Sequence, residues 1–202
     1  MKRSSESGLK AMRTVVTTRT YHRTSRSAAW STCSRAGRPS AAVGAPFATT
    51  HEGGGRRTNR TETMYGLGGT AYVYFVYGMY YQFNVVTNVE ETPHAVLVRA
   101  LEPVEGLPIM RRRRAGRSEY ELTSGPGRLC VALGIDRGLD KDDLLGDRVW
   151  IEEADSISPG QIARGPRIGI DYAEKWVTKP WRFWLKDNPF VSRHPRLVRN
   201  RR

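Results

Sequence analysis

A run of aromatic side chains and one arginine inside an apolar strand are the features of this chain whose residue types could do chemistry. Five of the nine tyrosines lie between residues 72 and 81, in the segment YVYFVYGMYYQFN. Arg99 interrupts the apolar segment HAVLVRALEP. Aromatic faces stack on planar rings and on cations, whereas an unpaired guanidinium in a dry core costs several kcal/mol. Arg99 is therefore either half of a structural salt bridge or part of a polar site.

The aromatic segment has the alternation of a half-buried strand, and it folds back at Gly78. We predict a hairpin of two strands, 71–77 and 79–87. Gly78 supplies a permissive backbone, so Tyr77 should lie near the tip, where no neighbouring strand covers its ring. Tyr74 lies mid-strand, where a flat ring can line a pocket. The alternative interpretation is that all five rings belong to the core.

The remaining elements are predicted from apolar patterns and from Pro and Gly positions. We expect two helices, Val104–Arg113 and a short one that runs from the Ser-Gly-Pro segment to Gly134. Further strands are expected at 94–101, at 148–153, at 167–170 with a helical turn after it, and in the segment WRFWL. No βαβ alternation, Rossmann glycine motif or P-loop is present in the sequence. The pattern predicts a mixed α and β fold, a single domain on antiparallel strands.

The chain is strongly basic, with 33 Lys and Arg against 20 Asp and Glu and a net charge of +13. Such an excess usually indicates a polyanionic partner, most often nucleic acid. Basic side chains cluster in loops and at the end of the chain, at Arg56, Arg57 and Arg60, at 111–114 and at 196–202. These clusters could meet phosphates. A solvated surface run is the alternative for 111–114.

The first fifty residues differ in composition from the rest. Between Ser7 and His51 there is no Asp or Glu, and small and polar residues dominate. A segment so poor in large apolar residues cannot offset its chain entropy, so disorder is one hypothesis. The other is translation in the wrong frame of a GC-rich gene. We divide the chain into this anomalous segment, 1–50, a folded domain, 51–195, and a basic tail, 196–202.

Targeting signals and cysteine chemistry are not evident in the sequence. No stretch is apolar over the roughly 18 residues of a membrane span, and MKRSSESGLK lacks the apolar part of a signal peptide. Cys33 and Cys130 have no metal-ligand spacing and suit a reducing compartment. We expect a cytoplasmic protein that contacts no membrane and has no disulfide, metal or cofactor.

Several segments, in order and spacing, resemble the alkyladenine (3-methyladenine) DNA glycosylase family. They run from GGRRTNRTE through YVYFVYGMYYQFNVV, VLVRALEP, SGPGRLCVALGI and PRIGI to KPWRFW, and they cover about residues 51–193. The resemblance implies a curved antiparallel sheet with a protruding hairpin and short flanking helices. It also implies a monomeric DNA repair hydrolase that flips alkylated or deaminated purines out of double-stranded DNA and hydrolyses the N-glycosidic bond.

The resemblance assigns roles to individual residues. Tyr77 is similar to the side chain inserted into the duplex, and Tyr74 and His51 are similar to the pair that sandwiches the extruded base. Asn84 resembles the pocket residue that disfavours a 2-amino group. Arg99 resembles the arginine that positions the hydrolytic water. In the family a backbone carbonyl also contacts this water, and the matching position in this chain is Ile168.

The sequence departs from the family at one catalytic position. The family's Glu-Ala-Tyr signature lies eleven residues before the histidine, which would place the general-base glutamate at Ser40 and the tyrosine at Ala42. Glu52 and Glu62 flank the motif but do not match its position. Hydrolysis through an oxocarbenium-like state needs such a carboxylate. As written, the chain is expected to bind damaged DNA better than it cleaves it.

Three hypotheses remain open at the level of sequence. The first is an active glycosylase whose first fifty residues reflect a frame error. The second is a relative that binds lesions but is catalytically impaired. The third, from a different class, is a single-stranded nucleic-acid binding module that stacks bases on sheet aromatics.

Overall fold

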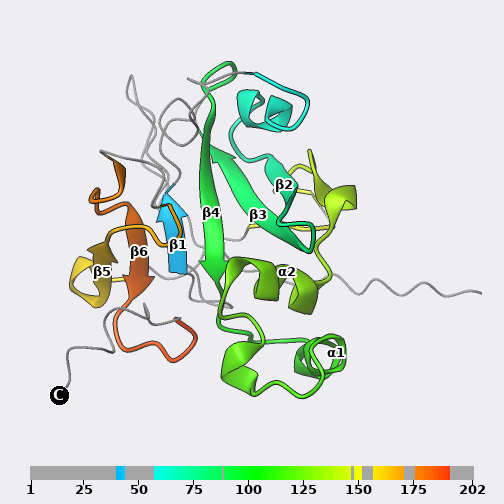
Figure 1. Cartoon of the computed structure of the whole chain (residues 1–202), viewed down its shortest axis with the longest axis vertical. Helices are drawn as coiled ribbons and strands as arrows, with labels where there is room; N and C mark the ends of the chain where they lie inside the picture. The colour runs from blue at the N-terminus through cyan, green and yellow to red at the C-terminus, as the bar shows by residue number, and fades with distance from the viewer. Residues whose placement is uncertain are drawn as a thin grey trace, which may run out of the picture.

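One antiparallel sheet of six strands organises the molecule, in the order β2-β3-β4-β1-β6-β5. The structure is a computed structural model and describes residues 40–43, 57–87, 89–146, 148–151, 157–170 and 176–191. Figure 1 shows the sheet with its helices on one side. The strands are β1 Ser40–Val43, β2 Ala71–Val76, β3 Tyr80–Thr87, β4 His94–Ala100, β5 Ile162–Gly165 and β6 Arg182–Leu185. The helices are α1 Leu107–Arg113 and α2 Pro126–Leu133, and short 3₁₀ turns are η2 Glu62–Tyr65, η3 Glu119–Glu121, η4 Arg137–Leu139 and η5 Pro159–Gln161.

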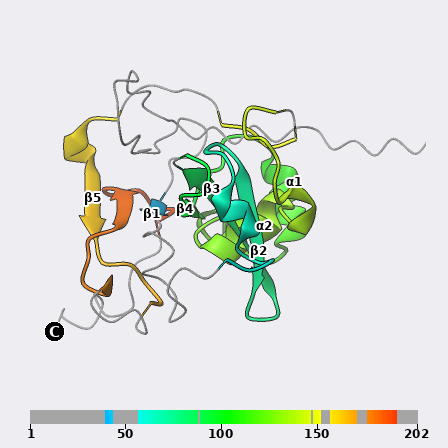
Figure 2. The ribbon, with the colours of Figure 1, turned by 90° about the horizontal axis from the view of Figure 1, so that it is seen from above.

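The predicted aromatic hairpin is confirmed. Its strands pair from Ala71 opposite Val85 to Val76 opposite Tyr80, and the Met79 amide donates to the Val76 carbonyl at 3.2 Å to close the turn. The two central residues of this turn, Tyr77 and Gly78, both have positive φ. Two positive φ values are typical of the hairpin turn whose twist matches that of the strands. The hairpin protrudes from the body in Figure 2.

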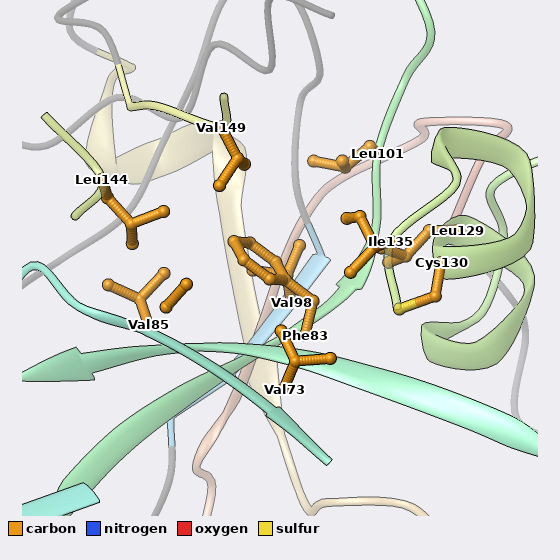
Figure 3. Close-up of a cluster of buried hydrophobic side chains, with 11 residues drawn as sticks. Val73, Phe83, Val85, Val98, Leu101, Leu129, Cys130, Ile135, Leu144 and Val149 are labelled. Atoms are coloured by element: carbon orange, nitrogen blue, oxygen red, sulfur yellow. The ribbon is translucent and has the colours of Figure 1, made fainter. Parts of the chain in front are cut away.

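The core lies between the hairpin strands, β4 and α2. Val73, Phe83 and Val98 point from the sheet toward Leu129 and Cys130 of the helix, as Figure 3 shows. These side chains are almost fully buried, and their clustering gives this face the largest share of hydrophobic stabilisation. The opposite face of the same strands carries a smaller buried cluster, formed by Met64, Tyr72, Val86 and Ala95, with Tyr74 packed against it.

Both predicted helices are present, with one shifted start. The first begins at Leu107 rather than Val104, because Gly106 has a left-handed φ of 76° and Pro108 follows in the first turn. The second runs from Pro126 to Leu133 and ends at Gly134, whose φ of 72° makes the left-handed cap. No helix among the described residues is long and apolar enough to cross a membrane.

The hypothesis that residues 1–50 are disordered is wrong at Ser40–Val43. This short segment is β1, and it pairs with β4 on one side and β6 on the other. Its sequence, SAAV, carries little apolar area, so composition gave no strand signal. Backbone hydrogen bonding to two neighbours needs no such signal. The remainder of the segment lies outside the described residues.

Two of the later strand predictions are also wrong. Residues 148 and 149 form a bend and 150–151 have no regular structure, although Val149 is buried in the core, and residues 152–153 lie outside the described part. The strand expected at 167–170 lies earlier in the chain, at β5, because Pro166 follows it and Gly169 turns the backbone with a φ of 74°. The helical turn expected after it falls outside the described residues. The strand in WRFWL is confirmed as β6.

Candidate functional site

A row of directly paired residues crosses five strands on the face opposite the helices. Tyr72 pairs with Asn84, Asn84 with Leu97, Leu97 with Ala42, and Ala42 with Arg182. Directly paired residues of an antiparallel sheet lie on the same face. The sheet register therefore brings together positions from the hairpin, the centre and the far edge.

Tyr74 lies one step along the same face. Its hydroxyl donates to Gln82 Oε1 at 2.6 Å across the hairpin, and its ring lies 5.1 Å from the Tyr72 ring at an angle of 36°. The guanidinium of Arg60 stands over the Tyr74 ring, 4.9 Å from its centroid. Tyr74 is half-buried on the polar side of the sheet, so the ring is fixed in position yet is not a member of the main core.

Asn84 is buried, with 5% of its surface exposed. Its side-chain amide donates to the carbonyls of Tyr72 at 3.1 Å and Gln82 at 3.3 Å. The amide orientation is thereby fixed by the backbone of the hairpin. Beside it, burial raises the pKa of the Tyr72 phenol, which stays protonated at neutral pH.

Arg99 shares this face with Leu97, since alternate residues of a strand point the same way. Burial and, to a smaller extent, the positive charge of Arg182 lower the pKa of Arg99 to about 10, against an opposing effect of the Tyr74 hydroxyl. Its Nε atom is buried and has no hydrogen-bond partner among the described residues. None of the ion pairs within the described part of the chain includes Arg99. The structural salt bridge offered as its alternative is therefore not seen there.

The backbone at Ser40 lies beside Arg99. Ser40 pairs with Ala100 and Ala41 pairs with Val98, so the register slips by one residue and Arg99 falls in the irregular step between them. Such a bulge re-aims the side chain that it carries. The position at which a glutamate was expected is thus adjacent to the arginine with which it would act, and a serine occupies it.

Tyr77 lies at the hairpin tip, as predicted. It is 76% exposed and has a φ of 54°, a left-handed conformation that is uncommon for a residue with a large side chain. Met79 beside it is 63% exposed. The interpretation that all five tyrosines are core is wrong for Tyr77, while Tyr72 is buried as that interpretation required.

Two predicted site residues, Ile168 and His51, are not brought together with the others by the described part of the structure. Ile168 is half-buried in the bend after β5, between Arg167 and Gly169. His51 lies outside the described residues. The sequence analysis missed Gln82, Arg182 and Arg60 as members of this face. The pairing across the hairpin would have found Gln82, whereas no sequence signal placed the two arginines there.

Part of the predicted basic surface is neutralised. Arg57 forms ion pairs with Glu62 at 2.7 Å and Glu91 at 2.6 Å, and Arg111 pairs with Glu119 at 2.6 Å. A second group gathers around Arg114, whose pKa is lowered by burial and by the positive charges of Arg128 and Arg117. Among the described residues, no three His, Cys, Asp or Glu side chains are grouped as metal ligands would be.

Comparisons with known proteins identify the family of this chain. The family model described as methylpurine-DNA glycosylase matches residues 44–189, and the chain belongs to this family of DNA repair hydrolases, which act on DNA with damaged bases. A protein of Bacillus cytotoxicus named "Putative 3-methyladenine DNA glycosylase" is 49% identical over 156 residues, which is 71% of this chain and 75% of that protein. Proteins of the same name from Bacillus cereus strain G9842 (49% over 153 residues, 71% and 75%) and Desulfitobacterium hafniense (47% over 150 residues, 70% and 73%) are similar in extent.

Proposed function

We propose that this glycosylase flips a damaged purine out of double-stranded DNA and presents it, as a monomer, to the face that carries Tyr74 and Arg99. The observation that carries the proposal is that an exposed ring at the hairpin tip and a fixed ring on the sheet belong to one rigid hairpin. Such a hairpin can fill the vacated stack and hold the extruded base at the same time. Extrusion costs a few kcal/mol, so a wedge shifts the balance toward the flipped state.

Tyr77 is the proposed wedge. Its ring stands clear of the body at the tip, and its left-handed backbone is strained for a tyrosine. Strained residues persist where the surrounding structure holds them, and they concentrate at functional sites. The hairpin ladder, paired along its whole length, supplies that rigidity.

Tyr74 is the proposed platform for the extruded base, with His51 on the base's other side. Base stacking on an aromatic ring contributes about 1–3 kcal/mol, and a positively charged alkylpurine is attracted to the ring more strongly than a neutral purine. Asn84, with its amide held by two backbone carbonyls, is proposed to reject bases that carry a 2-amino group.

Arg99 is proposed to position the hydrolytic water together with the carbonyl of Ile168. The buried Nε atom supports this role, because a guanidinium donor left without a partner is costly unless a substrate or water occupies it. The carboxylate that should deprotonate this water is missing at Ser40. Hydrolysis by this chain is therefore expected to be slow, and lesion binding by an impaired enzyme is the second candidate function.

The experiment uses a duplex oligonucleotide with one hypoxanthine, incubated with the whole chain and then heated in alkali. Strand scission at the lesion supports the active glycosylase. Tight binding of the lesion duplex without scission supports the lesion-binding function. A preference for undamaged single strands over the lesion duplex contradicts both and supports the single-stranded binding module.

A further inference from the structure

The ring of Tyr74, which is the proposed platform for the base, is already stacked against the guanidinium of Arg60. Arg60 lies in the turn that precedes η2, and its guanidinium carbon is 4.9 Å from the centroid of the Tyr74 ring. Arg60 also acts on the neighbouring phenol, since its positive charge opposes the rise in the pKa of Tyr72 that burial causes. Tyr74 itself is held in place by its contact with the Tyr72 ring and by the hydrogen bond from its hydroxyl to Gln82. The guanidinium and the ring therefore form a fixed stack.

A cation over a ring changes what else that ring can bind. The attraction of an aromatic face for positive charge arises from its quadrupole. A cationic base that stacks on the opposite face of the ring places a second positive charge against the ring that already contacts Arg60. A base that stacks on the same face must displace the guanidinium. Displacing the guanidinium costs a neutral and a cationic base alike. Stacking on the opposite face is therefore the arrangement that distinguishes them, because there the positive charge of Arg60 disfavours a cationic base relative to a neutral one.

We propose that Arg60 is a specificity-determining residue that shifts the pocket away from cationic alkylpurines and toward neutral purines such as hypoxanthine. The inference rests on the proposed function, in which Tyr74 stacks on the extruded base. Arg60 contacts the Tyr74 ring and not the N-glycosidic bond. It should therefore affect which base is bound and not the rate at which a bound base is hydrolysed.

The chain offers a matched control for this idea. Arg57 lies three residues earlier, just before that turn, and its guanidinium carbon is 4.7 Å from the centroid of the Tyr65 ring rather than over Tyr74. Replacing Arg57 with methionine removes the same unit of positive charge nearby, where it is paired with Glu62 and Glu91. Both variants therefore lower the net charge of the protein by one unit, and only the variant at Arg60 alters the charge on the Tyr74 ring.

The test compares binding of two duplexes by fluorescence anisotropy at roughly 0.15 M salt, where long-range attraction is screened. One duplex carries 3-methyladenine, which is cationic and has no 2-amino group, and the other carries hypoxanthine, which is neutral. Because binding is measured, the test does not depend on hydrolysis. For Arg60→Met, the affinity for 3-methyladenine relative to hypoxanthine should rise roughly three- to tenfold above that of the unaltered protein. Arg60→Lys should keep most of the original ratio, and Arg57→Met should leave it unchanged.

Equal loss of affinity for both duplexes in Arg60→Met would overturn the inference, because Arg60 would then act only on the DNA backbone. So would an equal rise of the ratio in Arg57→Met. These outcomes leave the proposed function standing if the unaltered protein still prefers either lesion duplex over undamaged duplex. If the unaltered protein shows no such preference, the proposed function and this inference fail together.

Discussion

Arg99 and Ser40 are neighbours across two central strands, although they are far apart in the chain. The register between β1 and β4 slips beside them, so that Arg99 occupies the irregular step next to the Ser40 backbone. The buried Nε atom of Arg99 has no hydrogen-bond partner among the described residues. The arginine that we propose to hold the hydrolytic water thus lies beside the position at which the family resemblance expects a carboxylate.

Ser40→Glu should raise the rate of hypoxanthine excision. A positioned general base contributes typically 10² to 10⁴ in rate, so we expect a gain of roughly a hundredfold, measured as alkali-dependent strand scission in single turnover. Ser40→Gln is the matched control, because it has the same shape and no base. If both variants gain equally, or neither does, Ser40 does not hold the position of the missing carboxylate.

Arg99→Met should stabilise the protein while it abolishes any hydrolysis. Burial lowers the pKa of Arg99 to about 10, which means that the folded state disfavours its charged form. This penalty is present at pH 7, and it is relieved only as the pH rises above about 10, because the unfolded chain then binds the proton more tightly. Removing the charge should raise the free energy of unfolding by about 1–3 kcal/mol, as judged from urea denaturation.

Affinity for the lesion duplex should stay largely intact in Arg99→Met, because the residue is proposed to hold water rather than the base. Unchanged hydrolysis would remove Arg99 from the site. A marked loss of stability would show that the guanidinium has a structural partner after all.

Tyr77→Ala should weaken binding of a hypoxanthine duplex more than binding of undamaged duplex. The loss expected for one aromatic stack is about 1–3 kcal/mol, or roughly five- to 150-fold in affinity. Tyr77→Asn separates the ring from the backbone, since asparagine tolerates the observed φ of 54°. That variant should keep or raise the melting temperature and still lose the lesion preference. An equal loss on both duplexes would remove the wedge role.

Gly127→Ala should loosen the attachment of the hairpin to α2. A Cβ at Gly127 would lie 2.8 to 3.0 Å from three atoms of Tyr80, including two of its ring. Overpacking of this kind costs about 1–3 kcal/mol. In the double variant with Tyr80→Ala, much of that cost should disappear, so the two effects measured by urea denaturation should not add. Simple additivity would mean that the contact does not position the hairpin.

Cys130 should resist thiol reagents in the folded protein. Burial raises the pKa of its thiol to about 12, and the reactive species is the thiolate. In a Cys33→Ala background, labelling at pH 8 should be slow in buffer and rapid in denaturant. The same shift should reduce stability as the pH rises above about 9, where only the unfolded chain releases the thiol proton. Rapid labelling without denaturant would contradict this.

Local sequence alone predicted the elements that are specified within a few residues. The alternation of β2 and β3, with a glycine at their turn, fixes the hairpin, because a period of two and a positive φ are both local properties. The Pro126 and Gly134 positions bound α2 for the same reason. Tyr77 at the tip and Tyr74 in mid-strand follow directly from that hairpin.

Only the tertiary structure decided which residues meet across the sheet. The placement of β1 between β4 and β6, the shift of the late strand to β5 and the stacking of Arg60 on Tyr74 all depend on contacts distant in sequence. Backbone pairing leaves little trace in side-chain types, as SAAV shows, and a surface arginine can reach many partners. The sequence determined that the chain has an aromatic hairpin and an isolated strand arginine. The sheet register determined that Ser40 lies beside that arginine, because pairing between distant strands sets which positions are adjacent.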